Sequence, residues 1–324
     1  MNFTGSPGPA VFNSGKTLYS QAQGAGRTRF LIVGVNSTPI PEGILVSLAG
    51  TVGAGLPPGD YLLSVRDGAA SGPGGEETQF AGAATSFTVG ESIPDSPSGL
   101  IAHLSAGGGW KTIVSLFNPS PAPVPVRIAA WSSSGSPLAI PWAVASGGSA
   151  GAAGGPFSWT IQPNGTLDLV ADDPANPAVT VGWAQLYAPA SVSGWVTYAM
   201  NLPSGWRSET VVPVERRSPV SLVLPFDNSS DYSTGVAVAN NSEIGGAAVL
   251  VVARDGEGRH LFSDLLALPV RGHTSFDSAL EYPALSGLKG TLEFQNTLDG
   301  AIAVVGVRFH STGTLAAISP VLKD

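Results

Sequence analysis

Two stretches of the sequence repeat the same order of apolar and polar residues at a nearly fixed spacing. Residues 109–119 (GWKTIVSLFNP) match residues 231–241 (DYSTGVAVANN), which begin 122 positions later. Residues 161–165 (IQPNG) are similarly parallel to residues 268–272 (LPVRG), 107 positions later. Internal similarity at this spacing predicts two copies of one structural unit.

A third match and one insertion define the extent of the copies. Residues 182–186 (GWAQL) parallel residues 290–294 (GTLEF), and the spacing shortens because the first copy carries a Gly/Ala/Ser-rich loop at 145–156. Each copy has about seven short strand-like segments, with turn residues roughly every 8–12 positions, which is typical of an immunoglobulin-like β-sandwich. We therefore expect one such sandwich at residues 100–216 and a second at 217–324.

Glycine and proline interrupt the whole chain. There are 42 glycines and 27 prolines among 324 residues, whereas hydrophobic residues make up 43%. The absence of a Gly-X-Y period excludes collagen, and the apolar content is sufficient for packed cores. Short apolar runs separated by Gly and Pro predict an all-β protein. Only residues 275–285 have the pattern of a short helix.

The segment before the repeat also has strand-like runs. Apolar residues at 29–35 and 43–52 precede a PPGD turn at 57–60, and a further apolar run at 85–89 closes the segment. Residues 92–99 are rich in proline and serine, a composition typical of a linker.

Part of this segment resembles a known family. The order of IPEGIL at residues 40–45, a strand that begins at the PPGDY turn, and a closing FTV strand is similar to the later part of a cohesin-like domain. Cohesins are jelly-roll sandwiches similar to some carbohydrate-binding modules, so the resemblance implies that residues 1–91 form a partial sandwich of this kind. No dockerin-binding residue can be matched, and only the fold is carried over. Residues 100–324 resemble tandem modules of large exported bacterial proteins of unknown role.

Charge and cysteine content narrow the class of protein. There are 23 acidic and 15 basic side chains, and a net charge of −8 disfavours nucleic acid as a partner. Cysteine is absent, and the Gly/Ser/Thr/Ala-rich composition is typical of exported bacterial β-proteins. No apolar run of about 18 residues predicts membrane insertion. Residues 1–7 lack signal-peptide features, so we expect a secreted or cell-surface protein whose signal peptide is absent from this chain.

No motif predicts an enzyme or a cofactor. The four histidines lie in separate segments without metal-ligand spacing, and no G-x-S-x-G motif occurs. Asp172 and Asp173 are adjacent in a proline-interrupted turn, where neighbouring side chains point apart. The loops at residues 227–231 and 255–258 offer oxygen ligands that suit calcium. Asx-rich turns have the same composition for backbone reasons alone, so structural calcium remains an alternative to no metal.

Tryptophan is distributed unevenly between the two copies. All seven tryptophans lie in the first copy: Trp110, Trp131, Trp142, Trp159, Trp183, Trp195 and Trp206. Alternation along a strand places Trp131 on the same face as Arg127 and on the opposite face from Val126 and Ile128. The second copy has Ala253 at the position matched to Trp131, which favours a surface position because a core would not tolerate the change in volume.

A second strand extends this aromatic face. Ala184 and Leu186 match apolar residues of the second copy, which marks them as inward. Trp183, Gln185 and Tyr187 alternate with them, so we expect these three side chains to point outward.

Two functions fit such a face. Aromatic rings with neighbouring amides can stack on sugars, which predicts a ligand site at Trp131, Trp183, Gln185 and Tyr187. The same side chains can instead pack against a neighbouring domain or against the loop at 145–156. We expect a non-enzymatic adhesion or scaffold protein whose partner is a protein or a polysaccharide at the cell surface. A carbohydrate-binding accessory module is the alternative, and the sequence leaves the oligomeric state open.

Overall fold

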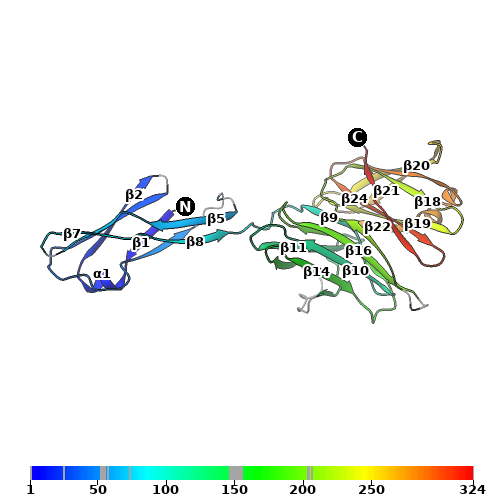
Figure 1. Ribbon diagram of the computed structural model, residues 1–324. Helices are drawn as coiled ribbons and strands as arrows, with labels where there is room; N and C mark the ends of the chain where they lie inside the picture. The colour runs from blue at the N-terminus through cyan, green and yellow to red at the C-terminus, as the bar shows by residue number, and fades with distance from the viewer. Residues whose placement is uncertain are drawn as a thin grey trace. The chain divides into compact units, whose positions relative to one another are not determined.

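The chain consists of two compact units, Met1–Gly90 and Glu91–Asp324, and Figure 1 traces them along the sequence. A computed structural model describes the following residues: 2–24, 26–51, 56, 58–72, 74–145, 156–202, 205 and 207–323. Within them nearly all regular structure is β-strand, and every strand pair in the sheets is antiparallel. The predicted all-β class is therefore confirmed.

The first unit contains four separate two-stranded sheets. The strand pairs are β1 (Asn2–Pro7) with β4 (Val46–Thr51), β2 (Thr17–Gly24) with β3 (Arg27–Val33), β5 (Gly59–Val65) with β8 (Ala83–Val89), and β6 (Gly68–Ser71) with β7 (Glu77–Phe80). A short helix not expected from the sequence, α1 (Pro9–Asn13), follows β1 and begins at a proline, whose fixed φ suits the first helical turn. Among the described residues of this unit, only Gly8, Ala10, Val11 and Ser14 are buried.

The second unit contains two β-sandwiches in sequence order. The strands of the first are β9 (Gly99–Ala106), β10 (Trp110–Phe117), β11 (Val124–Ser132), β12 (Trp142–Val144), β13 (Phe157–Ile161), β14 (Thr166–Asp172), β15 (Thr180–Tyr187), β16 (Ser193–Asn201) and β17 (Arg207–Pro213). They form the sheets β13-β11-β15-β9 and β12-β14-β10-β16-β17.

The second sandwich follows the same plan. Its strands are β18 (Ser221–Asp227), β19 (Tyr232–Asn240), β20 (Ala247–Asp255), β21 (His260–Leu268), β22 (His273–Asp277), β23 (Lys289–Asn296), β24 (Ile302–His310), β25 (Leu315–Ile318) and β26 (Val321–Leu322). They form the sheets β21-β20-β23-β18-β26 and β22-β19-β24-β25. The order β11-β15-β9 thus corresponds to β20-β23-β18, and β14-β10-β16-β17 corresponds to β22-β19-β24-β25. The segments that repeat in the sequence lie in or beside corresponding strands.

Buried polar bonds recur at corresponding places in the two sandwiches. The hydroxyl of Thr112 accepts from the Ser105 N–H at 2.9 Å and donates to the Ser105 carbonyl at 3.0 Å. Thr234 makes the same two bonds to Asp227, at 2.9 and 3.1 Å. Each threonine therefore fixes the first two strands of its sandwich to one another without leaving a buried hydroxyl unpaired.

A buried asparagine closes the other end of the second strand in each sandwich. The side-chain amide of Asn118 donates to the carbonyls of Ala122 and Ile161. Asn118 also donates to the carbonyl of Gln162. Asn240 donates to the carbonyls of Gly245 and Pro269, which correspond to those of Ala122 and Gln162. Neither asparagine is exposed.

The loop that each asparagine holds contains a left-handed residue. This residue is Asn164 in the first sandwich, with φ of 53°, and Arg271 in the second, with φ of 52°. Asparagine adopts this conformation more readily than arginine does.

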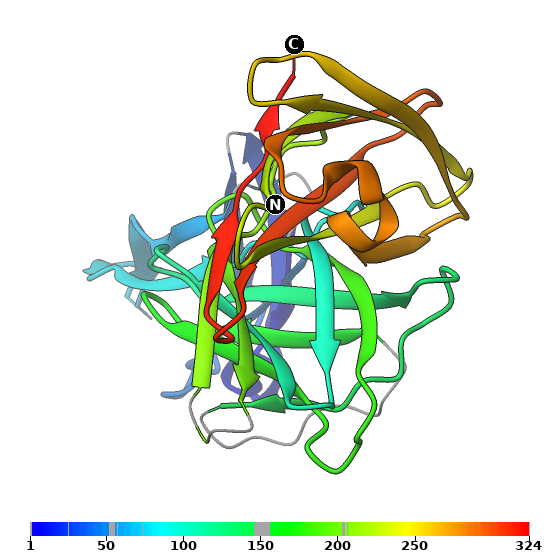
Figure 2. The same cartoon turned by 90° about the vertical axis from the view of Figure 1, so that its right-hand side faces the viewer.

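The two sandwiches pack against each other through the sheet β22-β19-β24-β25 (Figure 2). On β19, Val236 and Val238 belong to the core of the second sandwich, whereas Ala237 and Ala239 pack into the core cluster of the first. The strand is therefore buried on both faces, and its small alanines allow close approach of the two sheets.

Two edge strands also meet at this junction. The N–H groups of Leu315 and Ala317 on β25 donate to the hydroxyls of Ser208 and Thr210 on β17, at 2.9 and 2.6 Å. These side-chain acceptors satisfy backbone donors that β24 does not reach.

The segment expected to be helical contains two short turns of helix, α2 (Ser278–Glu281) and η1 (Pro283–Leu285). Asp277 caps the first, because its carboxylate accepts from the N–H groups of Ala279 and Leu280. Among the described residues, no helix has both the length and the apolar character needed to cross a membrane.

Candidate functional site

The residues of the predicted aromatic face do lie together on one side of a sheet. Strand β11 pairs with β15 so that Trp131 is opposite Trp183 and Arg127 is opposite Tyr187. Ala129 is opposite Gln185 in the same register. The neighbouring residues of β11, Val126 and Ile128, are fully buried in the core of the first sandwich. The predicted face thus points away from that core.

Most of this face is covered rather than open to solvent. Trp183 and Gln185 are 0% exposed and Tyr187 is 5% exposed. The cause is the second sandwich, which covers them: the indole N–H of Trp183 donates to the carbonyl of Arg271 at 2.7 Å. Packing against a neighbouring domain, the alternative to a sugar-stacking platform, therefore accounts for Trp183 and Gln185.

The proposed match between Trp131 and Ala253 is wrong. Ala253 is fully buried and pairs with Leu292 in the core of the second sandwich. The residue of the first sandwich in the corresponding position is Ala130, which pairs with Ala184. The alignment is shifted by one residue in this strand, and a shift of one residue exchanges the faces of a strand.

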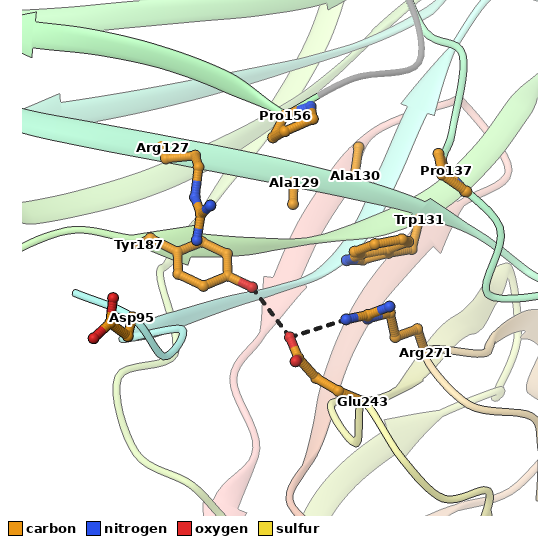
Figure 3. A pocket seen from close by; sticks show the side chains of 10 residues that line it. All are labelled: Asp95, Arg127, Ala129, Ala130, Trp131, Pro137, Pro156, Tyr187, Glu243 and Arg271. Carbon is orange, nitrogen blue, oxygen red and sulfur yellow. Dashed lines mark hydrogen bonds and ion pairs between the residues drawn. The ribbon is translucent and has the colours of Figure 1, made fainter. Parts of the chain in front are cut away.

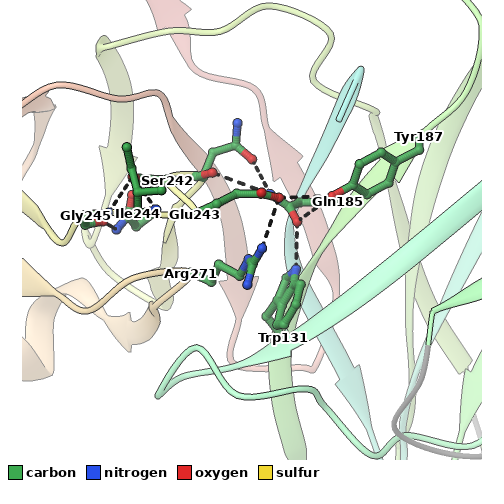
Figure 4. Close-up of polar contacts among 10 residues, drawn as sticks. Trp131, Gln185, Tyr187, Ser242, Glu243, Ile244, Gly245 and Arg271 are labelled. Carbon is green, nitrogen blue, oxygen red and sulfur yellow. Dashed lines mark hydrogen bonds and ion pairs between the residues drawn. The ribbon is translucent and has the colours of Figure 1, made fainter. Parts of the chain in front are cut away.

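Gln185 is the centre of a hydrogen-bond network that joins the two sandwiches (Figure 4). Its carbonyl oxygen accepts from the indole N–H of Trp131 at 2.9 Å and from the Tyr187 hydroxyl at 3.2 Å. Its amide donates to the side-chain oxygen of Asn241 at 2.8 Å. A buried amide with partners on both of its polar atoms fixes the orientation of everything bonded to it.

Charged groups continue this network toward the surface. The Glu243 carboxylate is 3.1 Å from the Arg271 guanidinium and 3.3 Å from the Tyr187 hydroxyl. The Arg271 guanidinium also lies over the Trp131 ring, 4.2 Å from its centroid. Burial, with a smaller contribution from the charge of Glu243, raises the pKa of Tyr187, so this phenol is neutral and available as a donor.

A pocket of about 310 Å³ opens beside this network (Figure 3). Its polar and aromatic lining consists of Asp95, Arg127, Trp131, Tyr187, Glu243 and Arg271. Its apolar walls are Ala129, Ala130, Pro137 and Pro156. Trp131 and Tyr187, two of the four predicted ligand residues, line this pocket. Glu243 and Arg271 come from the second copy and were missed, because each copy was considered on its own.

A turn of the first sandwich docks beside the same region. The carbonyl of Ser133 accepts from the His273 N–H at 3.2 Å. Gly135, with φ of 80°, lies so close to Val270 that an added Cβ would overlap the carbonyl oxygen of Val270. Glycine is required here both for its backbone conformation and for the close approach.

The other tryptophans that the structure describes do not line the pocket. Trp142 is in the core, Trp159 stacks on Phe157, and Trp110 packs edge-on against Phe309. Trp195 is 43% exposed. Trp206 and most of the loop at 145–156 lie outside the described residues.

Two histidines that are far apart in the sequence meet at the junction of the sandwiches. Nδ1 of His103 is 3.2 Å from Nε2 of His273, and the rings stack with centroids 5.3 Å apart. Burial lowers the pKa of His103 to about 4, and burial together with the His103 charge lowers the pKa of His273 to about 3. Three or more potential metal-binding side chains do not converge anywhere in the described residues.

The carboxylates of the two acidic loops form ion pairs with basic side chains of the same chain. The Asp227 carboxylate is 3.2 Å from the Arg308 guanidinium and 3.4 Å from the Lys289 ammonium. Asp255 is 2.7 Å from Arg259.

Comparison of the chain with protein-family models, with curated proteins and with solved structures finds no match.

Proposed function

We propose that the chain is a non-enzymatic adhesion or scaffold protein of the cell surface or extracellular space, in which Glu91–Asp324 acts as one rigid body. The absence of cysteine, the Gly/Ser/Thr/Ala-rich composition and the resemblance of the sequence to exported repeat modules support this location. Its partners in this role are surface proteins or polysaccharides, because a net charge of −8 disfavours nucleic acid.

The proposal rests on one observation: the aromatic face of the first sandwich is covered by the second sandwich. Trp183 and Gln185 would be the centre of a ligand platform, but they bond to Arg271 and Asn241 of the second sandwich instead. Ala237 and Ala239 add apolar contact at the same junction. A junction with both hydrogen bonds and a continuous apolar core resists bending, which is what a spacer or scaffold requires.

The rigidity is measurable because the chain has no native cysteine. Spin labels at Thr160→Cys and Ala267→Cys, both exposed positions, report the distance between the two sandwiches by pulsed electron paramagnetic resonance. Labels at Thr160→Cys and Ser193→Cys, both in the first sandwich, give the width expected for a rigid pair. We expect the two distance distributions in the full chain to be equally narrow. A broad distribution between the sandwiches would contradict the proposal.

Carbohydrate binding is the second candidate function. It no longer depends on Trp183 and Gln185, which are covered, but on the pocket that keeps Trp131 and Tyr187 in its lining. Trp131 itself offers little stacking surface, because the Arg271 guanidinium lies over its ring. Polar and charged recognition within the pocket therefore matters more than stacking on an open indole.

A further inference from the structure

Arg127 is the one arginine in the pocket that has no acidic partner among the described residues. Its neighbour Arg271 is 3.1 Å from the Glu243 carboxylate, whereas no carboxylate of the described chain lies within ion-pair distance of Arg127. Its buried Nε also has no hydrogen-bond partner. The Nε of Arg271 is also without a partner, but only Arg127 lacks a carboxylate as well, so its guanidinium charge is the one available to an anion.

Tyr187 holds this guanidinium in place. The Arg127 guanidinium lies 3.9 Å from the centroid of the Tyr187 ring, and Tyr187 is itself fixed by bonds to Gln185 and Glu243. Figure 3 shows Arg127 next to the Tyr187 ring among the residues that line the pocket. An arginine that is positioned before binding loses little conformational entropy when it binds a planar carboxylate through two parallel hydrogen bonds.

The other charges of the pocket narrow the ligand to a weakly charged anion with hydroxyl groups. Asp95 and Glu243 also line the pocket. They repel the dianionic charge of a phosphate monoester more strongly than the single charge of a carboxylate, and they accept hydrogen bonds from hydroxyls. A net charge of −8 likewise disfavours densely charged polyanions. The apolar walls formed by Ala129 and Pro156 suit the CH groups of a sugar ring.

We propose that this pocket binds the carboxylate of an acidic sugar, that is, a uronate unit of a polysaccharide. Arg127 binds the carboxylate, and Glu243 and Asp95 accept hydrogen bonds from the ring hydroxyls. This assignment deepens the carbohydrate-binding candidate and does not depend on the rigidity of the two sandwiches.

The test is calorimetric titration of the full chain with a galacturonate trisaccharide and with its methyl ester. The ester keeps the ring and its hydroxyls but removes the charge. We expect the acid to bind at least about tenfold more tightly than the ester, because hydrogen bonds to a charged group exceed neutral ones by about this factor. Equal affinity for the two, or no binding of the acid, would overturn the proposal.

Variants identify the residue responsible. Arg127→Gln should weaken binding of the acid by at least about tenfold, and Arg127→Lys should weaken it less because the charge remains. Arg254→Gln is the matched control, because Arg254 is a partly buried arginine on a strand of the second sandwich and does not line the pocket. This control should change affinity by less than about twofold, since it removes the same charge at a distance. An effect of the same size at Arg254 would overturn the assignment to Arg127.

Two competing ligands test the sugar assignment. Acetate carries the carboxylate alone, and a glutamate-rich peptide carries carboxylates on a polypeptide. We expect both to bind more weakly than the galacturonate trisaccharide. If either binds as tightly as the trisaccharide, the sugar ring contributes nothing and the assignment to an acidic sugar is wrong. The spin-label distances remain a separate measurement, so loss of sugar binding and loss of rigidity are distinguishable.

Discussion

The imidazoles of His103 and His273 stack across the junction of the two sandwiches, with Nδ1 of one 3.2 Å from Nε2 of the other. One ring nitrogen of the pair must donate and the other must accept, so the accepting ring is neutral and the two rings cannot both be protonated. Burial enforces this state by lowering the pKa of His103 to about 4 and that of His273 to about 3.

Stability should therefore fall as the solution becomes more acidic than pH 6.5. In the unfolded chain both histidines bind protons near their ordinary pKa of 6.5. Between that pH and about pH 4 the unfolded state binds more protons than the folded state, so acidification favours unfolding. Thermal unfolding from pH 7.5 to 4.5 should show a smaller loss of Tm in the double variant His103→Gln, His273→Gln than in the wild type. The exposed His260→Gln should retain the wild-type dependence; equal slopes for all three proteins would contradict this origin.

Removing the central amide of the network should destabilise the protein. Gln185→Leu deprives the Trp131 indole of its acceptor, whereas the Tyr187 hydroxyl keeps the Glu243 carboxylate within reach. Leaving buried donors unpaired costs about 1–3 kcal/mol, which denaturant unfolding measures. Gln295→Leu is the control, because Gln295 is exposed on β23, and it should change stability by less than about 0.5 kcal/mol. A similar loss for both variants would show that the network is not the cause.

Two glycines with nearly the same φ allow the cost of a strained backbone to be measured separately from the cost of disturbed contact between the sandwiches. Gly135 and Gly258 have nearly the same φ, 80° and 79°, but only Gly135 faces another part of the chain, whereas a Cβ on Gly258 meets nothing within 4 Å. Alanine at either position costs about 1–2 kcal/mol for the left-handed backbone. Gly135→Ala should cost more than Gly258→Ala, and only Gly135→Ala should broaden the spin-label distance between the sandwiches. Equal effects of the two substitutions on both measurements would argue against docking through the Gly135 turn.

The two buried asparagines should behave as equivalent structural elements. Asn118→Ala removes an amide that donates to three carbonyls, and Asn240→Ala removes one that donates to two. We expect each to cost at least about 2 kcal/mol in denaturant unfolding. Because they lie in different sandwiches, the double variant should equal the sum within about 0.5 kcal/mol. A loss of stability in only one of the two variants would mean that the corresponding hydrogen bonds do not stabilise the two sandwiches equally.

The sequence predicted best those features that depend on the alternation of side chains along a strand or on the internal repeat. The inward positions of Val126 and Ile128 followed from a period of two, since the core of a sandwich selects apolar side chains at every second residue. The matched positions of Asn118 and Asn240 followed from the repeat, because the same loop needs the same buried amide in both copies.

Long-range contacts between the copies were not predictable in the same way. The alternation of side chains along the strand indicates only that Trp183 and Gln185 face away from their own core. It contains no information about what covers that face. The His103–His273 contact likewise depends on how two completed sandwiches dock. The shift between Trp131 and Ala253 has a simpler cause: β11 begins six residues after Asn118, whereas β20 begins seven residues after Asn240, so the spacing of 122 is one residue too short in these strands.

The bonds from Leu315 and Ala317 to the hydroxyls of Ser208 and Thr210 have a consequence for how copies of this protein meet. An unpaired strand edge can template a strand of another molecule and begin intermolecular β-sheet growth. On β25 these two outward N–H groups are already bound by side chains, which offer no continuing backbone for a further strand. A chain with many strands in a row can in this way remain soluble at the junction of its repeats without a charged or proline-protected edge there.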